Sequence, residues 1–159
     1  MQSITPFLWY DGDAEEAVSL YTSIFPDSRV VSEMRQGEAG PNEPGSVLSI
    51  TFELNGQTLH AMNGGPGQPF NMAVSLMVEA NTQDEIDRYY DGLASGGGEA
   101  LPCGWVKDKF GLHWQVTPKR LMELMSHEDP DVAKRAAEAM FTMTKIDIAA
   151  LEAAVEGAE

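Results

Sequence analysis

The chain has 159 residues, of which 43% are hydrophobic and 22% are charged. This length and composition fit one domain, or two small modules that share a core, and exclude a disordered chain. Ten Lys and Arg residues stand against 25 Asp and Glu residues, which gives a net charge of −15 at pH 7. Because such a surface repels phosphate groups, we expect neither nucleic acid nor an anionic membrane as a partner.

Two further features bear on the compartment in which the protein works. No stretch approaches the roughly 18 consecutive apolar residues of a membrane span, and the N-terminus has no basic region followed by an apolar stretch. We therefore expect a cytoplasmic protein. Cys103 is the only cysteine, so the chain can form neither an internal disulfide nor a multi-cysteine zinc site.

The first part of the chain predicts a strand, a helix and three further strands. Ile4–Tyr10 is rich in β-forming residues and ends at a turn signal. Asp13 and Glu16 have the spacing of a capping box, which starts a helix that Pro26 ends. The three strands that follow are separated by turn signals and cover Arg29–Arg35, Val47–Leu54 and Gln57–Met62.

The same pattern starts again after a Gly- and Pro-rich linker, Asn63–Pro69. Met72–Glu79 predicts a strand, and Thr82 with Glu85 forms a second capping box. Glycines end the helix that follows, whose apolar face consists of Ile86, Tyr89, Tyr90 and Leu93. Three short strands complete the repeat and cover Glu99–Pro102, Gly104–Asp108 and Leu112–Thr117.

These patterns predict an α+β fold built from two tandem βαβββ modules and C-terminal helices. Module one covers about residues 3–65, module two about 70–118, and the C-terminal helices about 118–156. In the tail, Asp129 precedes a proline at the first helical position, and Asp147 caps a last short helix. The apolar stripe of the tail favours packing on the body, or on a second copy, over ligand binding. Its residues are Val132, Ala136, Ala139 and Met140.

Four segments carry a family resemblance: TPFLWYDGDAEEAVSLYTSIFPDS, LHAMNGGP, TQDEIDRYYDGLASGG and CGWVKDKFGLHWQVTP. Over about residues 3 to 155 they resemble the PhnB-like group of the vicinal oxygen chelate superfamily, which includes glyoxalase I, extradiol dioxygenases and bleomycin-resistance proteins. The resemblance implies that the two modules curl into an incomplete barrel around a cavity, and that the protein is a homodimer.

Members of this group often carry the label 3-demethylubiquinone-9 3-methyltransferase. The sequence itself does not support that activity, because no predicted strand is followed by a Gly-rich G-x-G-x-x-G turn for a nucleotide-like methyl donor. Methyl transfer is therefore the last of three functional hypotheses.

The resemblance also implies a position for a metal ion. In metal-dependent members, four strands each direct one His or Glu toward a divalent ion that keeps open positions for substrate oxygens. The last of these positions falls on Gln115, where many members have Glu, and the position in module one falls on His60. The first-strand position falls near Pro6, and Asn71 and Ser75 are the polar candidates on the first strand of module two. At most two of the four ligands remain.

Strand geometry adds a further candidate. Because side chains alternate between the faces of a strand, His113 lies on the same face as Gln115, and Trp114 lies on the opposite face. His60 and His113, with Gln115, would then form a site for Zn, Ni, Mn or Fe that water or substrate completes. The alternative is that His113 is a hydrogen-bonded cavity residue and His60 a half-buried strand residue.

Other residues that bear chemistry have two interpretations each. The thiol of Cys103 could act as a nucleophile or redox sensor beside Lys107, or it could be a small buried apolar group. Trp9, Trp105 and Trp114 predict core or cavity wall, with stacking of a planar ligand as the alternative. We expect His127 to be a surface residue.

Two hypotheses therefore lead. In the first, the protein binds a small molecule in its cavity without a tight, complete metal site, and His60, Ser75, Cys103, Trp105, His113 and Gln115 are the candidate contacts. In the second, it is a divalent-metal-dependent lyase, isomerase or dioxygenase. The missing ligands favour the first.

Overall fold

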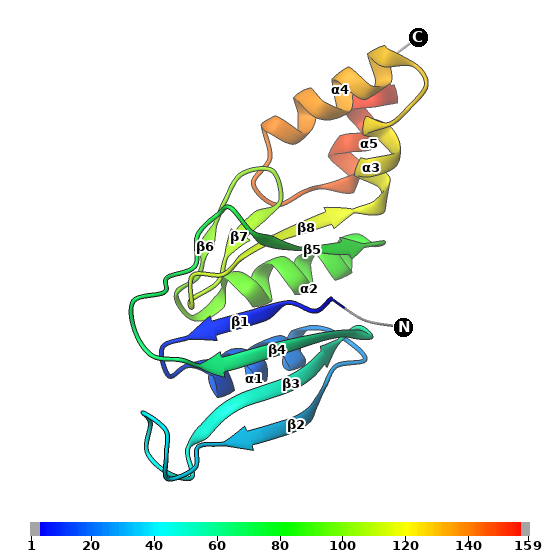
Figure 1. The fold of residues 1–159 in the computed structure, drawn as a ribbon. Coiled ribbons are helices and arrows are strands. Elements are labelled where there is room, and N and C mark those ends of the chain that lie inside the picture. Colours follow the sequence, from blue (N-terminus) through cyan, green and yellow to red (C-terminus); the bar gives the residue numbers. More distant parts are fainter. Residues whose placement is uncertain (1–3, 157–159) are drawn as a thin grey trace. The chain divides into compact units, whose positions relative to one another are not determined.

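The structure is a computed structural model that describes residues 4–156. The chain forms two compact units, Met1–Pro69 and Phe70–Glu159 (Figure 1). Each unit contains one four-stranded sheet with helices, and neither sheet closes into a barrel. The predicted α+β class is therefore confirmed, with one βαβββ repeat in each unit.

The first unit has the strand, helix and three strands that its sequence predicts. Its sheet order is β1-β4-β3-β2, in which β1 runs parallel to β4 and the other neighbours are antiparallel. The elements are β1 (Phe7–Tyr10), α1 (Ala14–Ile24), β2 (Arg29–Arg35), β3 (Val47–Leu54) and β4 (Gln57–Asn63). The tight turn at Asn55-Gly56 joins β3 to β4, and both residues have positive φ, which this short hairpin turn requires.

The start of α1 differs from the prediction. Asp13 precedes the helix, but its side chain makes no capping hydrogen bond, so the expected capping box with Glu16 is wrong. Asn63, which we assigned to the linker, is the last residue of β4 and takes this role. Its Oδ1 accepts a hydrogen bond from the backbone N–H of Ala14 at 2.9 Å. A residue distant in the sequence thus satisfies the helix end.

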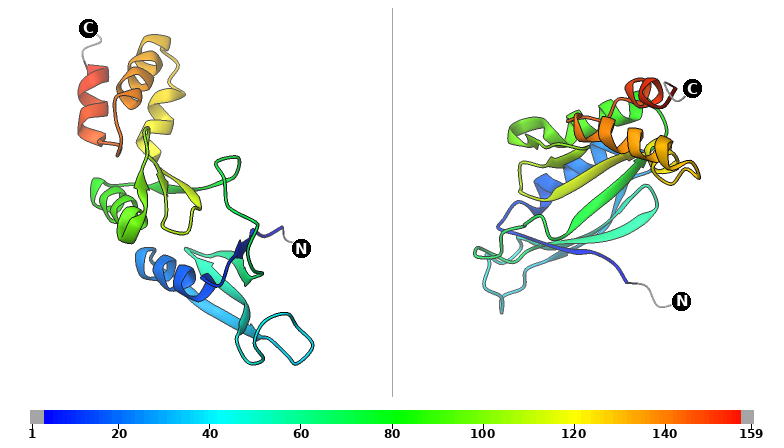
Figure 2. Two further views of the ribbon diagram at one scale, coloured as in Figure 1. Left: turned by 90° about the vertical axis from the view of Figure 1, so that its left-hand side faces the viewer. Right: turned by 90° about the horizontal axis from the view of Figure 1, so that it is seen from above.

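Helix α1 covers one face of the first sheet (Figure 2). Alternate strand residues are buried against it, among them Leu8, Tyr10, Ile50, Phe52, Leu59 and Ala61. The hydroxyl groups of Tyr10 and Tyr21 share a hydrogen bond of 3.0 Å within this core. The residues between these positions point to the other face, which we call the open face of the unit.

The second unit repeats the arrangement. Its sheet order is β5-β8-β7-β6, with β5 parallel to β8. The elements are β5 (Ser75–Ala80), α2 (Gln83–Ala94), the 3-10 turn η1 (Ser95–Gly97), β6 (Glu99–Ala100), β7 (Trp105–Lys107) and β8 (His113–Pro118). The capping box of Thr82 and Glu85 is confirmed. The predicted apolar face of α2 is buried, which leaves an open face on this sheet as well.

A buried carboxylate organises the turn between β7 and β8. Asp108 is only 1% exposed. Its Oδ1 accepts hydrogen bonds from the N–H groups of Phe110 and Leu112 at 2.9 and 3.0 Å, and its Oδ2 accepts one from Nε1 of Trp114 at 2.9 Å. Asp108 therefore fixes both the turn and the indole on the α2 side of the sheet.

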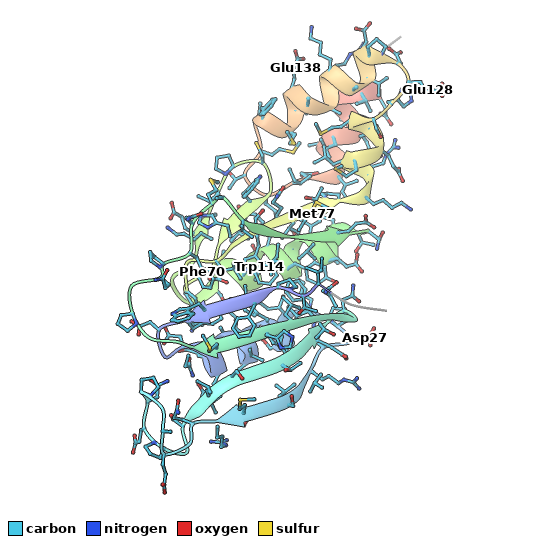
Figure 3. The ribbon with its side chains drawn as sticks, viewed as in Figure 1. Asp27, Phe70, Met77, Trp114, Glu128 and Glu138 are labelled. Atoms are coloured by element: carbon cyan, nitrogen blue, oxygen red, sulfur yellow. The ribbon has the colours of Figure 1, made fainter. Side chains whose placement is uncertain are left out.

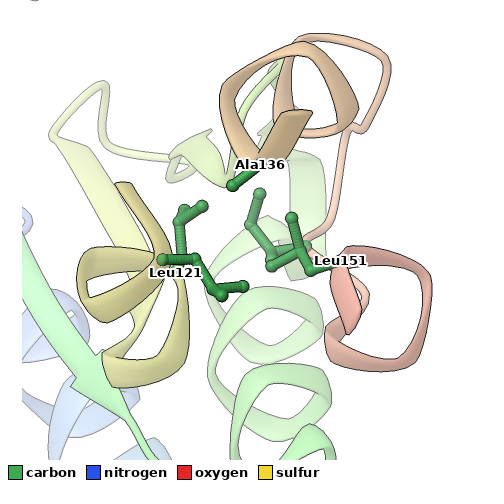
Figure 4. Close-up of a cluster of buried hydrophobic side chains, with 5 residues drawn as sticks. Leu121, Ala136 and Leu151 are labelled. Carbon is green, nitrogen blue, oxygen red and sulfur yellow. The ribbon is translucent and has the colours of Figure 1, made fainter. Parts of the chain in front are cut away.

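The tail forms three helices, α3 (Lys119–Met125), α4 (Pro130–Phe141) and α5 (Ile148–Glu156). They enclose a separate apolar cluster of Leu121, Leu124, Ala136, Ile146 and Leu151 (Figure 4). The predicted stripe of the tail packs in or against this cluster, which confirms the core interpretation. Among residues 4–156, no helix is both long and apolar enough to cross a bilayer.

The segment before α5 fastens the tail to α2. Nζ of Lys145 lies 3.1 Å from Asp87 and 2.7 Å from Asp91. The amide of Gln83 donates to the carbonyl of Ile146 and accepts from the N–H of Ile148. These contacts explain why the three tail helices belong to the second unit.

Candidate functional site

Four predicted site residues come together on the open face of the second unit. Ser75 on β5 pairs with His113 on β8, and Trp105 on β7 pairs with Gln115. Paired residues point to the same side of a sheet, so all four share this face. Nε2 of Gln115 donates a hydrogen bond to Oγ of Ser75 at 2.9 Å. The sequence alone could not reveal this contact, because the register of β5 and β8 is not visible in it.

Apolar surface lies beside these polar groups. Met77, the partner of Gln115 on β5, is 59% exposed on the open face. Trp114 is 2% exposed and lies on the opposite face, as the alternation along β8 predicts (Figure 3). The open face of the second unit therefore presents both apolar surface and hydrogen-bonding groups.

The imidazole of His113 is half-buried on this face. Its Nδ1 is a buried atom that has no hydrogen-bond partner within residues 4–156. The neighbouring Lys107 forms an ion pair with Glu99, with Nζ 2.5 Å from the carboxylate. The hydrogen bond and the positive charge of Lys107 lower the pKa of Glu99. The charges at this end of the face therefore compensate each other.

His60 lies on the open face of the first unit. Its Nδ1 and Oγ1 of Thr51 share a hydrogen bond of 3.1 Å, and its ring stacks on Phe7 with centroids 5.7 Å apart. His60 in the first unit is therefore half-buried with its Nδ1 bonded to Thr51, whereas the Nδ1 of His113 in the second unit has no hydrogen-bond partner within residues 4–156. A two-imidazole site made from both remains a prediction.

Phe7 and Gly64, which we did not single out from the sequence, shape the same face. Alternation along β1 predicts that Phe7 and Trp9 share a face, so this part could have been found from the sequence. The pairing of Phe7 with His60 depends on the sheet register, which the sequence does not show. Nε1 of Trp9 donates a hydrogen bond to the carbonyl of Gly65 at 2.8 Å, and its indole lies against Gly64. These contacts fix the ring of Trp9.

Cys103 lies in the turn between β6 and β7 and is half-buried. Its backbone has a φ of 61°, and its N–H donates to the carbonyl of Met143 at 2.8 Å. The next residue, Gly104, donates to the carbonyl of Thr144 at 2.7 Å. The turn is therefore held against the segment between α4 and α5, while Lys107 makes its ion pair with Glu99.

The donor groups of each unit do not fit a tightly held divalent ion. In neither unit does the part of the chain that the structure describes gather three His, Cys, Asp or Glu side chains around one point. The second unit offers the imidazole of His113 and the neutral amide of Gln115, which is already bonded to Ser75. Structural and catalytic divalent ions ordinarily require three or four ligands, with anionic or imidazole donors among them.

A pocket of about 420 Å³ lies near the start of α1 in the first unit. Asp11, Glu15, Glu43 and Asn63 are among its lining residues. The amide of Asn63 is fully engaged, because it accepts from Ala14 and donates to both Val47 and Glu15. Asn63, which links the helix to the sheet, is therefore part of the wall of this pocket.

Two sheets of equal strand order, each from one βαβββ repeat, define the fold of the vicinal oxygen chelate superfamily. PA1353 from Pseudomonas aeruginosa shares it at 20% identity, with a TM-score of 0.61 over 74% of this chain and 98% of that chain. The fosfomycin resistance protein FosX from Listeria monocytogenes, in complex with Mn(II) and sulfate, shares it at 12% identity, with a TM-score of 0.51 over 74% and 89%. These two likenesses show the fold alone.

The family is narrower than the fold. The family model described as 3-demethylubiquinone-9 3-methyltransferase matches residues 2–117. The PhnB protein from Bacillus cereus is 39% identical, with a TM-score of 0.65 over 74% of this chain and 99% of that chain. The chain therefore belongs to this PhnB-like family of the vicinal oxygen chelate superfamily. No curated protein matches it in a sequence search.

Proposed function

We propose that this protein works in the cytoplasm and binds a small, partly apolar molecule on the open faces of its sheets, without a tight and complete metal site. One observation carries the proposal: both open faces expose large apolar side chains beside hydrogen-bonding groups. Phe7 is 58% exposed beside His60 and Thr51, and Met77 lies beside Gln115 and Ser75. Ligand sites typically combine apolar surface with a few polar groups that set orientation.

The chemistry of Gln115 supports binding over metal catalysis. A neutral amide can exchange hydrogen bonds with an oxygen-bearing ligand, but it contributes no charge to hold a divalent ion. The hydrogen bond to Ser75 fixes the position of this amide, so a ligand meets a preoriented polar group. We expect Gln115 and His113 to contact the polar end of the ligand.

A divalent-metal-dependent lyase, isomerase or dioxygenase is the second candidate. The observation that favours it is the buried Nδ1 of His113, which has no partner in the described chain and is a competent metal ligand. FosX, which shares the fold, is seen with Mn(II). Methyl transfer, which the family description names, ranks third, because the chain has no Gly-rich turn for a nucleotide-like methyl donor.

A fragment screen separates these candidates. Protein treated with EDTA is screened by ¹H–¹⁵N NMR against small neutral and anionic fragments, and the screen is repeated with diamagnetic Zn(II) in place of the chelator. We expect fragments to shift amides of β1, β4, β5 and β8 equally with and without metal. Stoichiometric metal in the purified protein, with all fragment binding lost in EDTA, would establish the metalloenzyme instead. Heat on titration with S-adenosylmethionine would support methyl transfer.

We also propose that the protein is a homodimer. The large apolar side chains exposed on the edge strand β2, namely Val30, Val31 and Met34, support self-association, because an unpaired strand edge readily meets another chain. Light scattering at micromolar concentration tests this proposal. A monomer mass over the whole range would contradict it.

A further inference from the structure

The open face of the first unit carries two stacked rings. Phe7 on β1 and His60 on β4 are register partners, with ring centroids 5.7 Å apart and an interplanar angle of 25°. Phe7 nevertheless remains 58% exposed. The ring of Phe7 is thus held against the sheet by its contact with His60, while much of its own surface remains exposed.

Trp9 extends this surface along β1. It lies two residues after Phe7, on the same face, and is 37% exposed. A Cβ at Gly64 would lie 2.2 Å from the indole, so only glycine allows the ring to rest on this backbone. With Nε1 bonded to Gly65, the indole is held in place before any ligand arrives. We call Phe7, Trp9 and His60 the aromatic shelf.

The shelf has one polar group available to a ligand. Nδ1 of His60 is engaged with Oγ1 of Thr51, which fixes the plane of the imidazole. Nε2 of the same ring has no hydrogen-bond partner within residues 4–156. A ligand that lies on the shelf can therefore exchange a hydrogen bond with Nε2 of His60.

The charge around the shelf selects against anions. Phe7, Trp9, Thr51 and Met62 carry no charge. The chain as a whole has a net charge of −15. Because its field opposes anions, and the shelf contains neither a fixed cation nor a fixed anion to pair with a charged group, we expect an uncharged ligand.

We propose that the aromatic shelf binds an uncharged compound with a flat aromatic ring and a hydroxyl or carbonyl substituent. The ring stacks on Phe7 beside the indole of Trp9, and the substituent forms a hydrogen bond with Nε2 of His60. This inference rests on the proposed binding function and narrows it to one class of ligand.

Three probes of similar size test the class: 2-naphthol, its saturated analogue decahydro-2-naphthol, and the anion 2-naphthoate. Each is titrated into the ¹⁵N-labelled full chain in EDTA, and amide shifts are followed. We expect 2-naphthol to shift amides of Phe7–Tyr10 and Gln57–Asn63 and to bind at least tenfold more tightly than the other two. Equal affinity of the saturated alcohol or the anion at these residues would overturn the inference, as would no binding of 2-naphthol there.

Variants test the named side chains. Phe7→Leu keeps apolar bulk but removes the ring, so we expect the affinity for 2-naphthol to fall about 2- to 10-fold while decahydro-2-naphthol is unaffected. Phe141→Leu, the same change at an exposed phenylalanine of α4, is the matched control and should leave the affinity unchanged. An amide spectrum that retains the dispersion of the wild type shows that Phe7→Leu is folded. Unchanged binding of 2-naphthol by Phe7→Leu would contradict the stacking.

The hydrogen bond has its own test. Replacing the hydroxyl of the probe by a methyl group, as in 2-methylnaphthalene, should weaken binding to the wild type but not to His60→Phe. Equal losses in both proteins would contradict the role of Nε2.

The probe titrations and the fragment screen together distinguish an error in the ligand class from an error in the proposed function. If decahydro-2-naphthol binds the shelf as tightly as 2-naphthol, small-molecule binding stands and the aromatic class is wrong. If no probe and no fragment binds either open face in EDTA, both proposals fail.

Discussion

Gln115 on β8 donates a hydrogen bond to Ser75 on the adjacent parallel strand β5. The two residues lie 40 positions apart, and their contact fixes the amide on the open face of the second unit. If the ligand uses this amide, removing its partner must weaken binding even though Ser75 itself need not touch the ligand.

Ser75→Ala is therefore expected to lower the affinity of fragments that bind the second open face by about 5-fold, because one hydrogen bond contributes about 1 kcal/mol. Fragment titrations by NMR measure the change. Thr117→Val, on the same face of β8 but two residues further along, is the matched loss of a hydroxyl and should have little effect. Equal losses from both variants would show that the face has been disturbed as a whole.

The buried carboxylate of Asp108 should be essential to the stability of the second unit. In Asp108→Asn, one oxygen becomes an N–H donor, so either the turn or the indole of Trp114 loses its acceptor. We expect the free energy of unfolding to fall by about 1–3 kcal/mol, measured by urea denaturation. Glu128→Gln, the same change of group on an exposed side chain, should stay within about 0.5 kcal/mol of the wild type. An unfolding free energy of Asp108→Asn equal to that of the wild type would contradict the hydrogen-bond assignment.

Asn63 is expected to determine the stability of the first unit. Asn63→Ala removes the acceptor of the Ala14 N–H and the donor to the carbonyl of Val47, which leaves two backbone groups without partners. We expect a loss of about 1–3 kcal/mol, read from urea unfolding or from faster hydrogen exchange at the start of α1. Asn81→Ala, an exposed asparagine before α2, is the control and should change the stability little.

The pair of Arg120 and Glu152 gives the tail a defined pH dependence. The hydrogen bond from Arg120 holds the pKa of Glu152 below its ordinary value of 4.5. A carboxylate with a lowered pKa in the folded state stabilises the protein above pH 4.5, and this contribution disappears as the pH falls through the lowered value. Because the pair is partly exposed and screened, we expect about 0.5–1 kcal/mol.

Glu152→Gln tests this dependence. The difference in unfolding free energy between the wild type and this variant should be largest near pH 7 and should shrink toward zero on acidification below the ordinary pKa of glutamate. Urea midpoints at several pH values measure it. A difference that grows as the pH falls would contradict the assigned sign.

The sequence predicted those features of the fold that depend on neighbouring residues. The bounds of β2 and β3 agree with the structure, and the capping box of Thr82 and Glu85 forms as expected. The similar pattern at Asp13 failed, because Asn63 reaches the same helix end from β4 and replaces the local cap. A local pattern is therefore reliable only where no distant side chain competes for the same N–H groups.

The candidate site likewise combines features that neighbouring residues predict with contacts that depend on distant residues. Alternation along β8 correctly grouped His113 with Gln115 and separated them from Trp114. The hydrogen bond of Gln115 with Ser75 and the stack of Phe7 on His60 depend on strand register across 40 and 53 positions. No local signal in the sequence sets such a register, so these contacts became visible only in the structure.

Binding of a small molecule to the open faces is expected to require no metal. One NMR titration of the labelled full chain with the best fragment of the screen tests this, carried out in EDTA and again with saturating Zn(II), a diamagnetic ion that leaves the amide signals sharp. We predict the same dissociation constant in both, with shifts confined to the open-face strands. A titration that shows binding only when Zn(II) is present would contradict this expectation.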